Sequence, residues 1–284
     1  MGICECESSS QAESQTQTQA QKGIIPEQKD NLKKKEENFI TAEIYIKEDE
    51  VNNKIRIINS YDEYQRIEMF KPLDVEKMNE EEIKTCKIQI NESAIPFNYF
   101  HIFQSAGNYR IKYSFKDNLT KTNYMFFGCK SLTKIDFANF NTQNVDDMEC
   151  MFHGCSSLKE LNISNFNTQK VTNMGHMFYG CSLLSTLNLS NFDTSNVTSM
   201  SCMFEHCESL KSLDLSNFNV QKVNNMVWMF CDCSALEYLN LSNFKIQENA
   251  EINDIFEGCY ALKKEYVIIN DQKLAFELFL QLKI

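Results

Sequence analysis

The sequence has no long apolar run and no recognisable export signal. No stretch approaches the roughly 20 consecutive apolar residues that a membrane-spanning helix needs. The N-terminus also lacks the basic start and apolar segment of a secretory signal. We therefore expect a cytoplasmic protein, or a peripheral protein on the cytosolic face of a membrane.

Positive charge is scarce as well. The 284 residues include 28 Lys and Arg against 39 Asp and Glu, which gives a formal net charge of -11. Nucleic-acid binding requires clustered Lys and Arg that neutralise phosphates, so nucleic acid is not an expected partner. A hydrophobic content of 43% is ordinary for a globular protein and is enough for a sizeable core.

The residue patterns that carry catalysis are also missing. No nucleophile is paired with a base, no pair of carboxylates has a catalytic pattern, and there is no Gly-rich phosphate loop. The histidines form no repeated set; they are His101, His153, His176 and His206. We predict that the protein is not an enzyme and holds no cofactor.

What the sequence does have is a phrase of Met-Phe, two variable residues and Cys that recurs every 26 residues. Its copies are residues 125–129, 151–155, 177–181, 203–207 and 229–233, and 255–259 has Ile in place of Met. A leucine column keeps the same step, at Leu132, Leu158, Leu184, Leu210, Leu236 and Leu262. A fixed period between about 20 and 29 residues with leucine at such positions is typical of leucine-rich repeats.

Each unit has the pattern of a strand, a turn and a helix. Residues 158–163 alternate as a half-buried strand does, while Val171, Met174, Met177 and Phe178 recur at three and four residues, as on one face of a helix. The predicted fold class is therefore α/β: a right-handed, leucine-rich-repeat-like solenoid with parallel strands on one face and short helices on the other. Stacking of the units would supply the core.

The longer phrase around these residues carries a resemblance. It reads Met-Phe-x-Gly-Cys-Ser-x-Leu-x-x-Leu-x-Leu-Ser-Asn-Phe-x-Thr-x-x-Val-x-x-Met and covers about residues 105–270. It resembles the BspA-type leucine-rich-repeat family of microbial surface and interaction proteins. The resemblance implies a curved solenoid used for adhesion or protein binding, and its members are often secreted or surface-bound. A cell-surface adhesin exported without a recognisable signal peptide is therefore an alternative function.

Three parts are expected along the chain. Residues 1–38 should form a disordered tail, since 8–23 are rich in Ser, Gln, Thr and Ala. Residues 39–104 should form a β-rich N-terminal cap, with a hairpin over 39–60 and a strand over 87–90. Residues 105–284 should form the solenoid, which ends in a capping part over about 264–284 with an amphipathic helix over 271–282.

The N-terminal residues suggest lipid attachment. Gly2 could accept myristate once Met1 is removed, and Cys4 or Cys6 could accept palmitate. One myristoyl chain binds membranes only marginally, so stable attachment would need the second acyl chain. The sequence leaves both acylation and an unmodified tail open, and Cys6 stands where the myristoylation motif has Ser or Thr.

Two cysteine-containing columns also follow the repeat. The first places one thiol in each unit, at Cys129, Cys155, Cys181, Cys207, Cys233 and Cys259, and packing explains such a column better than redox or metal chemistry does. The second consists of Cys150, His176, Cys202 and Trp228. Zinc sites usually contain paired short-range ligands such as C-x-x-C, which are absent, so we expect no metal.

Protein binding remains as the expected function. The residues between the leucine columns are small, polar and nearly uniform, whereas reading an irregular partner requires units that differ. Binding hot spots are usually Trp, Tyr and Arg, so the candidate binding residues are Tyr179, Trp228 and Tyr238. We predict a non-enzymatic protein-protein interaction scaffold that binds through the helix side or the caps. Its protein partners are not identified by the sequence.

Overall fold

The computed structural model describes residues 38–68 and 74–282. The chain divides into two units, Met1–Glu36 and Glu37–Ile284, and all that follows concerns the second unit. Its first half contains β1 (Asn38–Ile46), β2 (Lys54–Arg56), α1 (Tyr61–Glu68), α2 (Glu80–Ile83), β3 (Lys87–Ile90), β4 (Ser93–Ile95), β5 (Phe100–Ile102) and β6 (Gly107–Phe115). Its second half contains β7 (Leu132–Asp136), β8 (Glu160–Asn162), β9 (Ser212–Asp214), β10 (Tyr238–Leu241), β11 (Val267–Ile269) and α3 (Gln272–Gln281). Short 3-10 helices lie at Glu48–Glu50, Val75–Lys77 and Lys264–Tyr266.

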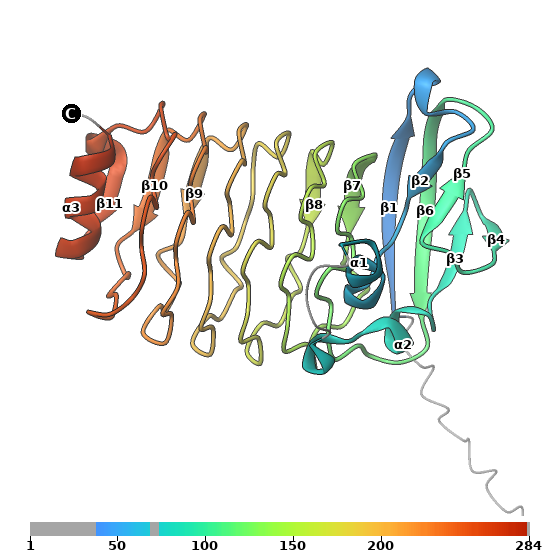
Figure 1. Cartoon of the computed structure of the whole chain (residues 1–284), viewed down its shortest axis with the longest axis horizontal. Coiled ribbons are helices and arrows are strands. Elements are labelled where there is room, and N and C mark those ends of the chain that lie inside the picture. Colours follow the sequence, from blue (N-terminus) through green and yellow to red (C-terminus); the bar gives the residue numbers. More distant parts are fainter. Residues whose placement is uncertain (1–37, 69–73, 283–284) are drawn as a thin grey trace, which may run out of the picture. The chain divides into compact units, whose positions relative to one another are not determined.

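A six-stranded mixed sheet joins the N-terminal region to the repeats, in the order β4-β3-β6-β1-β7-β8 (Figure 1). Strand β1 pairs antiparallel with β6 over nine residues and antiparallel with β7 on its other side. The β7–β8 pair is parallel. Alternate residues of β1 are buried, as the two-residue period of a strand requires: Ile40, Ala42, Ile44 and Ile46.

The strand expected over 87–90 is observed as β3, but the expected hairpin over 39–60 is wrong. Strand β2 does not pair with β1; it pairs antiparallel with β5, with Ile55 opposite His101. Both edges of β1 are already occupied by β6 and β7, whose residues lie far along the chain. No edge of β1 is therefore left for a local partner.

From Lys121 onward the 26-residue repeats stack one behind another (Figure 1). Two kinds of parallel contact connect them. On one side lie the strands, with β9, β10 and β11 forming a three-stranded parallel sheet. On the other side single bridges link residues 26 positions apart: Lys121, Asp147, Asn173, Ser199, Asn225 and Glu251. We call these the strand side and the bridge side.

The predicted fold class, a right-handed leucine-rich-repeat-like solenoid with parallel strands on one face and short helices on the other, is wrong. The sheet that begins the structure is mixed, and most of its strand pairs are antiparallel. The bridge side has no α-helix between α2 and α3, a range in which every residue is described. Between β8 and β9, also fully described, no strand forms either.

Two left-handed residues in each repeat prevent the expected helices. The first column with positive φ contains Tyr124, Cys150, His176, Cys202, Trp228 and Asp254. The second, four residues later, contains Gly128, Gly154, Gly180, His206, Asp232 and Gly258. A right-handed α-helix cannot include such residues, because its φ values are all negative. The Met-Phe pair stands between these columns and therefore cannot lie in a helix.

Backbone hydrogen bonds show what replaces the helix. Alternate N–H groups donate to the next repeat, as from Cys150 to the Gly175 carbonyl at 3.0 Å and from Phe152 to the Met177 carbonyl at 2.9 Å. The N–H groups between them close turns, as from His153 to the Cys150 carbonyl at 3.1 Å. These are three-residue steps within successive turns, not the four-residue steps of an α-helix. Half of the donors on the bridge side thus connect repeats.

The core runs through the middle of the stack. One phenylalanine per repeat forms a column of parallel rings with centroids 5.7 to 6.1 Å apart, at Phe126, Phe152, Phe178, Phe204, Phe230 and Phe256. All six are fully buried. At the C-terminal end α3 covers the last repeat with Leu274 and Leu278, and the Asp271 side chain caps its N-terminus. A helix is present in the range expected for the amphipathic helix, 271–282, but Phe279, expected on its buried face, is 52% exposed.

Candidate protein-binding surface

A row of stacked rings lies on the bridge side. Phe127, His153 and Tyr179 occupy the position after Met-Phe in three successive repeats, and their ring centroids are 4.5 and 4.3 Å apart. Tyr64 of α1 extends the row at one end, 4.7 Å from Phe127, and His206 extends it at the other, 5.5 Å from Tyr179. We call these five residues the aromatic strip. Each of them is half-buried.

The backbone of the repeats sets the geometry of the strip. The variable residue after Met-Phe is held between two left-handed residues, so its side chain leaves the turn in the same direction in each repeat. Parallel strands lie about 4.8 Å apart, and aromatic rings in contact have centroids about 4.5 to 7 Å apart. Rings placed one per repeat therefore meet face to face, as His153 and Tyr179 do with an interplanar angle of 7°.

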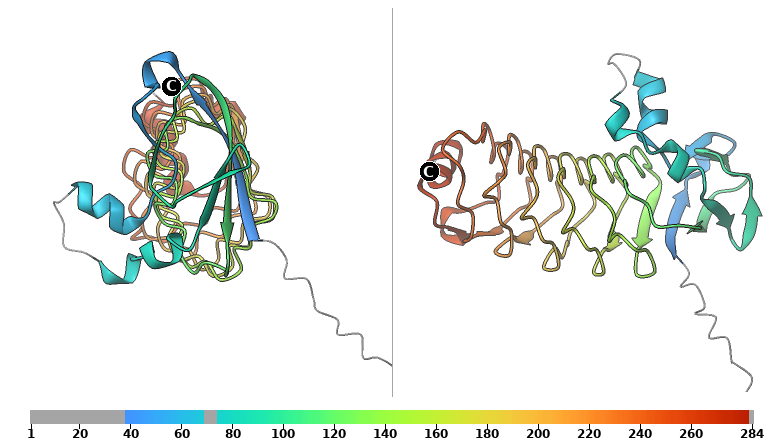
Figure 2. Two further views of the ribbon diagram at one scale, coloured as in Figure 1. Left: turned by 90° about the vertical axis from the view of Figure 1, so that its right-hand side faces the viewer. Right: turned by 90° about the horizontal axis from the view of Figure 1, so that it is seen from below.

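The N-terminal end of the strip is covered by the segment that carries α1 and α2. Tyr64 packs 4.6 Å from Tyr124 as well as against Phe127. Lys77 forms an ion pair with Glu149 of the next repeat. The Asn79 side-chain amide donates to the Asn123 carbonyl at 2.7 Å. Figure 2 shows α1 and β1 on opposite sides of the repeats, so this segment belongs to the bridge side.

Acidic side chains surround the other end of the strip. His206 Nδ1 lies 3.6 Å from Asp232 Oδ2 and 3.9 Å from Glu208 Oε1, and His206 Nε2 lies 3.9 Å from Glu205 Oε1. The side chains of Glu208 and Asp232 are 57% and 41% exposed, so both carboxylates face water. This end of the strip therefore has a negatively charged rim.

The imidazole of His153, inside the strip, is held neutral near pH 7. Burial, with a smaller contribution from nearby His176, lowers the pKa of His153 to about 4. Burial also lowers the pKa of His176, whose ring lies 6.0 Å from Tyr179. Removing an imidazolium from water costs free energy, so the uncharged form is favoured. The stacked rings of Phe127, His153 and Tyr179 cover one another's faces, so they offer uncharged ring edges near the acidic rim.

The structure places the predicted binding residues in different surroundings. Tyr179 lies at the centre of the aromatic strip. Trp228 lies on the bridge side outside the strip; it is 44% exposed, and its indole N–H donates to Asp254 Oδ2 at 3.3 Å. Tyr238 lies in β10 on the strand side and is not part of the aromatic strip. The candidate lipidation residues Gly2, Cys4 and Cys6 lie outside the described residues.

Sequence reasoning missed two residues of the strip. Tyr64 lies outside the repeats, so no period points to it. His206 comes one residue after the column of Phe127, His153 and Tyr179. It occupies the second left-handed position, where four of the other five repeats have glycine. His153 stands one period from Tyr179 and Phe127 stands two periods from it, and that spacing was the available signal.

The cysteine column faces the core. Each thiol from Cys155 onward donates to the carbonyl of the stacked phenylalanine one repeat earlier, as from Cys207 Sγ to the Phe178 carbonyl at 3.2 Å. Burial raises the pKa of Cys129, Cys207 and Cys259 to about 12. These thiols are therefore protonated packing groups. Among the residues that the structure describes, no three His, Cys, Asp or Glu side chains are grouped to hold a metal ion.

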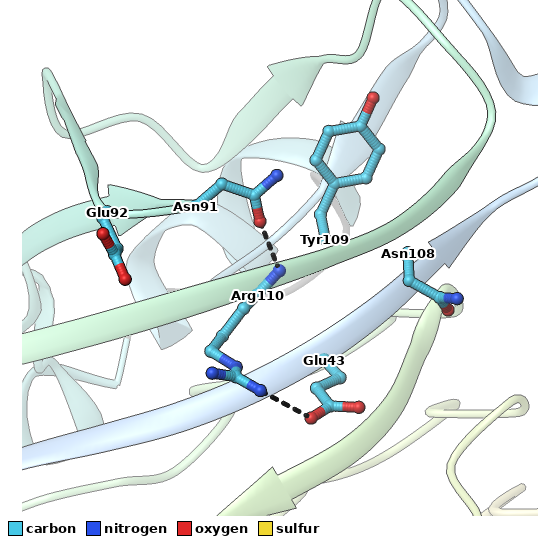
Figure 3. Close-up of a pocket in the computed structure, with 6 residues that line it drawn as sticks. All are labelled: Glu43, Asn91, Glu92, Asn108, Tyr109 and Arg110. Carbon is cyan, nitrogen blue, oxygen red and sulfur yellow. Dashed lines mark hydrogen bonds and ion pairs between the residues drawn. The ribbon is translucent and has the colours of Figure 1, made fainter.

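A shallow hollow on the N-terminal sheet has no comparable arrangement (Figure 3). Arg110 of β6 crosses its floor; its guanidinium lies 3.7 Å from Glu43 of β1, and its backbone N–H donates to Asn91 Oδ1 at 2.9 Å. The Arg110 and Glu43 side chains are 74% and 45% exposed, so this pair is an ordinary surface ion pair. The hollow holds no nucleophile beside a base.

The repeat region matches the model of one protein family. A family described as "Mycoplasma protein of unknown function, DUF285" matches residues 59–164, 97–187 and 157–269. The chain belongs to this family. The overlapping DUF285 matches confirm a repeat protein, and together they contain every residue of the aromatic strip and Trp228. No curated protein and no solved structure matches the chain. None of the helices among the described residues is long and apolar enough to cross a bilayer.

Proposed function

We propose that this DUF285 protein is a non-enzymatic scaffold that binds other proteins through the aromatic strip. The observation that supports this most is the unbroken row of ring contacts from Tyr64 to His206, with centroid distances from 4.3 to 5.5 Å. Aromatic side chains supply much of the energy at protein interfaces. Packing already holds these rings in place, so a partner would lose little side-chain entropy in binding them.

The chemistry of the surface favours a partner segment with basic side chains. A guanidinium or ammonium is attracted to carboxylates, and Glu208 and Asp232 stand beside the last ring of the strip. The formal net charge of -11 would also speed the approach of a basic partner at low salt. Arginine suits this surface best, because its planar guanidinium can bind a carboxylate through two hydrogen bonds.

A matched pair of tyrosine substitutions tests the proposal. Tyr179→Ala removes a ring from the strip, and Tyr238→Ala removes one from β10 on the strand side. Partners would be captured from a lysate with each variant, identified by mass spectrometry and then titrated by calorimetry. Tyr179→Ala is expected to weaken binding by at least about tenfold, since an interface hot spot contributes about 2 kcal/mol or more.

Two further variants check the chemistry. Asp232→Asn together with Glu208→Gln should slow association and reduce its salt dependence, because both carboxylates face water at the rim of the strip. Trp228→Ala tests whether the surface reaches beyond His206. The proposal fails if Tyr238→Ala loses a partner that Tyr179→Ala retains.

The resemblance of the repeat phrase to BspA-type leucine-rich repeats supports a binding function and also favours an alternative, a cell-surface adhesin. The two differ in location. Labelling intact cells with a reagent that cannot cross membranes would mark an adhesin and spare a cytoplasmic scaffold. Attachment to the cytosolic face of a membrane would need acylation at Gly2 with Cys4 or Cys6. Incorporation of a myristate analogue that is lost in Gly2→Ala, or of a palmitate analogue lost in Cys4→Ser, would support that attachment.

A further inference from the structure

The strand side carries two rows of polar side chains that run along the stack. Alternate residues of each strand face outward. Strand pairing puts them in register, since Glu43 of β1 lies opposite Arg110 of β6 and Lys134 of β7, and β7 continues in the same way to β8. With the 26-residue step of the repeats, the first row is Arg110, Glu43, Lys134, Glu160, Thr186 and Ser212, and the second is Thr41, Asp136, Asn162, Asn188 and Asp214. We call these two rows the polar track.

Three shallow hollows lie along the polar track without a break between them. The first, at β6, shares Glu43 and Arg110 with the second (Figure 3). The second shares Lys134 and Asp136 with the third. The third has a volume of about 520 Å³, and ligand sites typically measure about 300–1,000 Å³. The track therefore has room for a long ligand that crosses the strands from β6 to β9.

Hydrogen-bonding groups are left open along the third hollow. No strand forms between β8 and β9, and the backbone groups of residues 186–188 make no hydrogen bond to another part of the chain that the structure describes. Within the same described ranges, the hydroxyls of Thr186 and Ser212 and the side-chain nitrogen of Asn188 have no partner either. This stretch therefore offers both donors and acceptors to a ligand.

We propose that the polar track binds a neutral, unbranched β-1,4-linked polysaccharide, a function separate from protein binding by the aromatic strip. Its nearly uniform residues cannot read an irregular partner, but they match a ligand that itself repeats. Parallel strands lie about 4.8 Å apart, and an extended β-1,4-linked chain advances by a similar distance with each sugar. An extended peptide advances only about 3.3 Å per residue, so its side chains would fall out of step with the rows.

The width of the track also fits a sugar ring. The two rows stand two residues apart on each strand, which is about 6.6 Å, so the hydroxyls on both edges of a ring can reach them. A hydroxyl both donates and accepts hydrogen bonds, as the open groups of the third hollow require. The apolar C–H groups of the sugar would rest on Leu161 and Leu187, which line this hollow and are partly exposed.

Charge favours an uncharged chain. The charges of the first row alternate in sign and pair with one another, with Arg110 3.7 Å from Glu43 and Lys134 2.7 Å from Glu160. The two remaining positions of that row are hydroxyl residues, and the charged members of the second row are both carboxylates. The formal net charge of -11 also repels an acidic polysaccharide.

Calorimetric titration of the full chain with defined oligosaccharides tests the ligand class. Cellohexaose should bind at least about tenfold more tightly than cellobiose, because a longer chain contacts more repeats. Maltohexaose has as many glucose units, but its α-1,4 links curve the chain away from straight rows, so it should bind more weakly. Absence of binding by both cellohexaose and chitohexaose, or equal affinity for maltohexaose, would overturn the proposal. If acidic polygalacturonate binds more tightly than cellohexaose, the charge argument is wrong.

A matched pair of double variants tests the location. Thr186→Leu with Ser212→Leu removes two open hydroxyls from the track and should weaken cellohexaose binding at least about tenfold. Thr172→Leu with Thr198→Leu is the control, because these threonines are also exposed and one repeat apart but lie on the bridge side. Both proteins should keep the circular dichroism spectrum of the wild type. Unchanged affinity in the first protein, or equal losses in both, contradicts the site. The readout involves no protein partner, so its failure would leave the aromatic strip untouched.

Discussion

The substitution Gly154→Ala tests whether the chain turns through a left-handed residue at this position or continues through it as a helix. Gly154 has a φ of +71°, a value at which a side chain with a β-carbon is strained by about 1–2 kcal/mol. An added Cβ would meet only the Cα and N of Gly128, at 3.8 and 3.9 Å, so there is no steric clash. Alanine also reduces the entropy of the unfolded chain, which offsets about 0.4–1 kcal/mol. We therefore expect a net destabilisation of about 1 kcal/mol.

A helix that continued through residue 154 would give the opposite sign. Replacing glycine by alanine inside a helix stabilises it by about 0.5–1 kcal/mol. The assay is urea unfolding followed both by circular dichroism and by the fluorescence of Trp228, the single tryptophan. Coincident curves would justify a two-state free energy, which long repeat arrays do not always allow.

Two related variants complete this test. Gly154→Asn should cost less than Gly154→Ala, because asparagine tolerates the left-handed region. Gly258→Ala should cost more, because its Cβ would approach the Asp232 Cα to 3.0 Å and collide with the Asp232 side chain. A stabilising Gly154→Ala, or equal effects at positions 154 and 258, would refute the reasoning.

Three further outcomes follow from the core and the bridge side. Phe204→Ala should destabilise the protein by about 3–5 kcal/mol in the same urea assay, because its buried ring lies 5.7 Å from each of its two stacked neighbours. Burial raises the pKa of Cys207 to about 12. The stability that this buried thiol contributes is therefore complete below about pH 8.5 and is lost as the pH rises toward 12. Cys207→Ala should flatten the decline of the urea midpoint over this pH range. Burial also raises the pKa of Asp147 to about 6, so its ionisation costs stability as the pH rises from about 4 through 6. Asp147→Asn keeps the acceptor for the Glu149 N–H and should stabilise by about 3 kcal/mol at pH 8 and by little at pH 4, as measured by urea midpoints at the two pH values. If the Asp147→Asn variant is no more stable than the wild type at pH 8, the free-energy cost assigned to ionised Asp147 is wrong.

The period was readable from the sequence because it repeats without insertion. Bridges such as Asp147 to Asn173 and strand pairs such as Leu213 opposite Leu239 keep the predicted step of 26 residues. The apolar columns of the repeat phrase are also the buried columns of the core. Register and core were thus fixed by the order of apolar residues alone.

The helices were predicted wrongly because successive turns produce the same apolar spacing as a helix. Met174 and Met177 lie on the same side of the chain in a helix and in successive turns, because a turn also brings residues three positions apart onto one side. The left-handed residues would have separated the two conformations, but the first such column holds Tyr, Cys, His, Trp and Asp, of which only His and Asp are enriched at positive φ. Glycine in the second column gave a clearer hint, but it also suits the end of a helix.

The long-range strand pairing could not be predicted from local sequence patterns either. The strand β1 joins β6 and β7, and nothing in its own residues selects those partners over β2. For the same reason, the sequence pointed to only part of the candidate surface. Tyr179 stood out because its column varies between repeats, whereas Tyr64 joins the strip only through the packing of α1 on the first repeats.

The hydrogen bonds that link Cys150 to Gly175 and Phe152 to Met177 have a consequence for how such a chain can change over generations. Each repeat donates alternate N–H groups on the bridge side to carbonyls of the next repeat, and the same bonds recur along the stack. Duplication of 26 consecutive codons would therefore insert a unit whose upper and lower surfaces already fit its neighbours. The row of rings could lengthen or shorten by one position at a time while both ends of the protein stay unchanged, so the surface can diversify without a new fold.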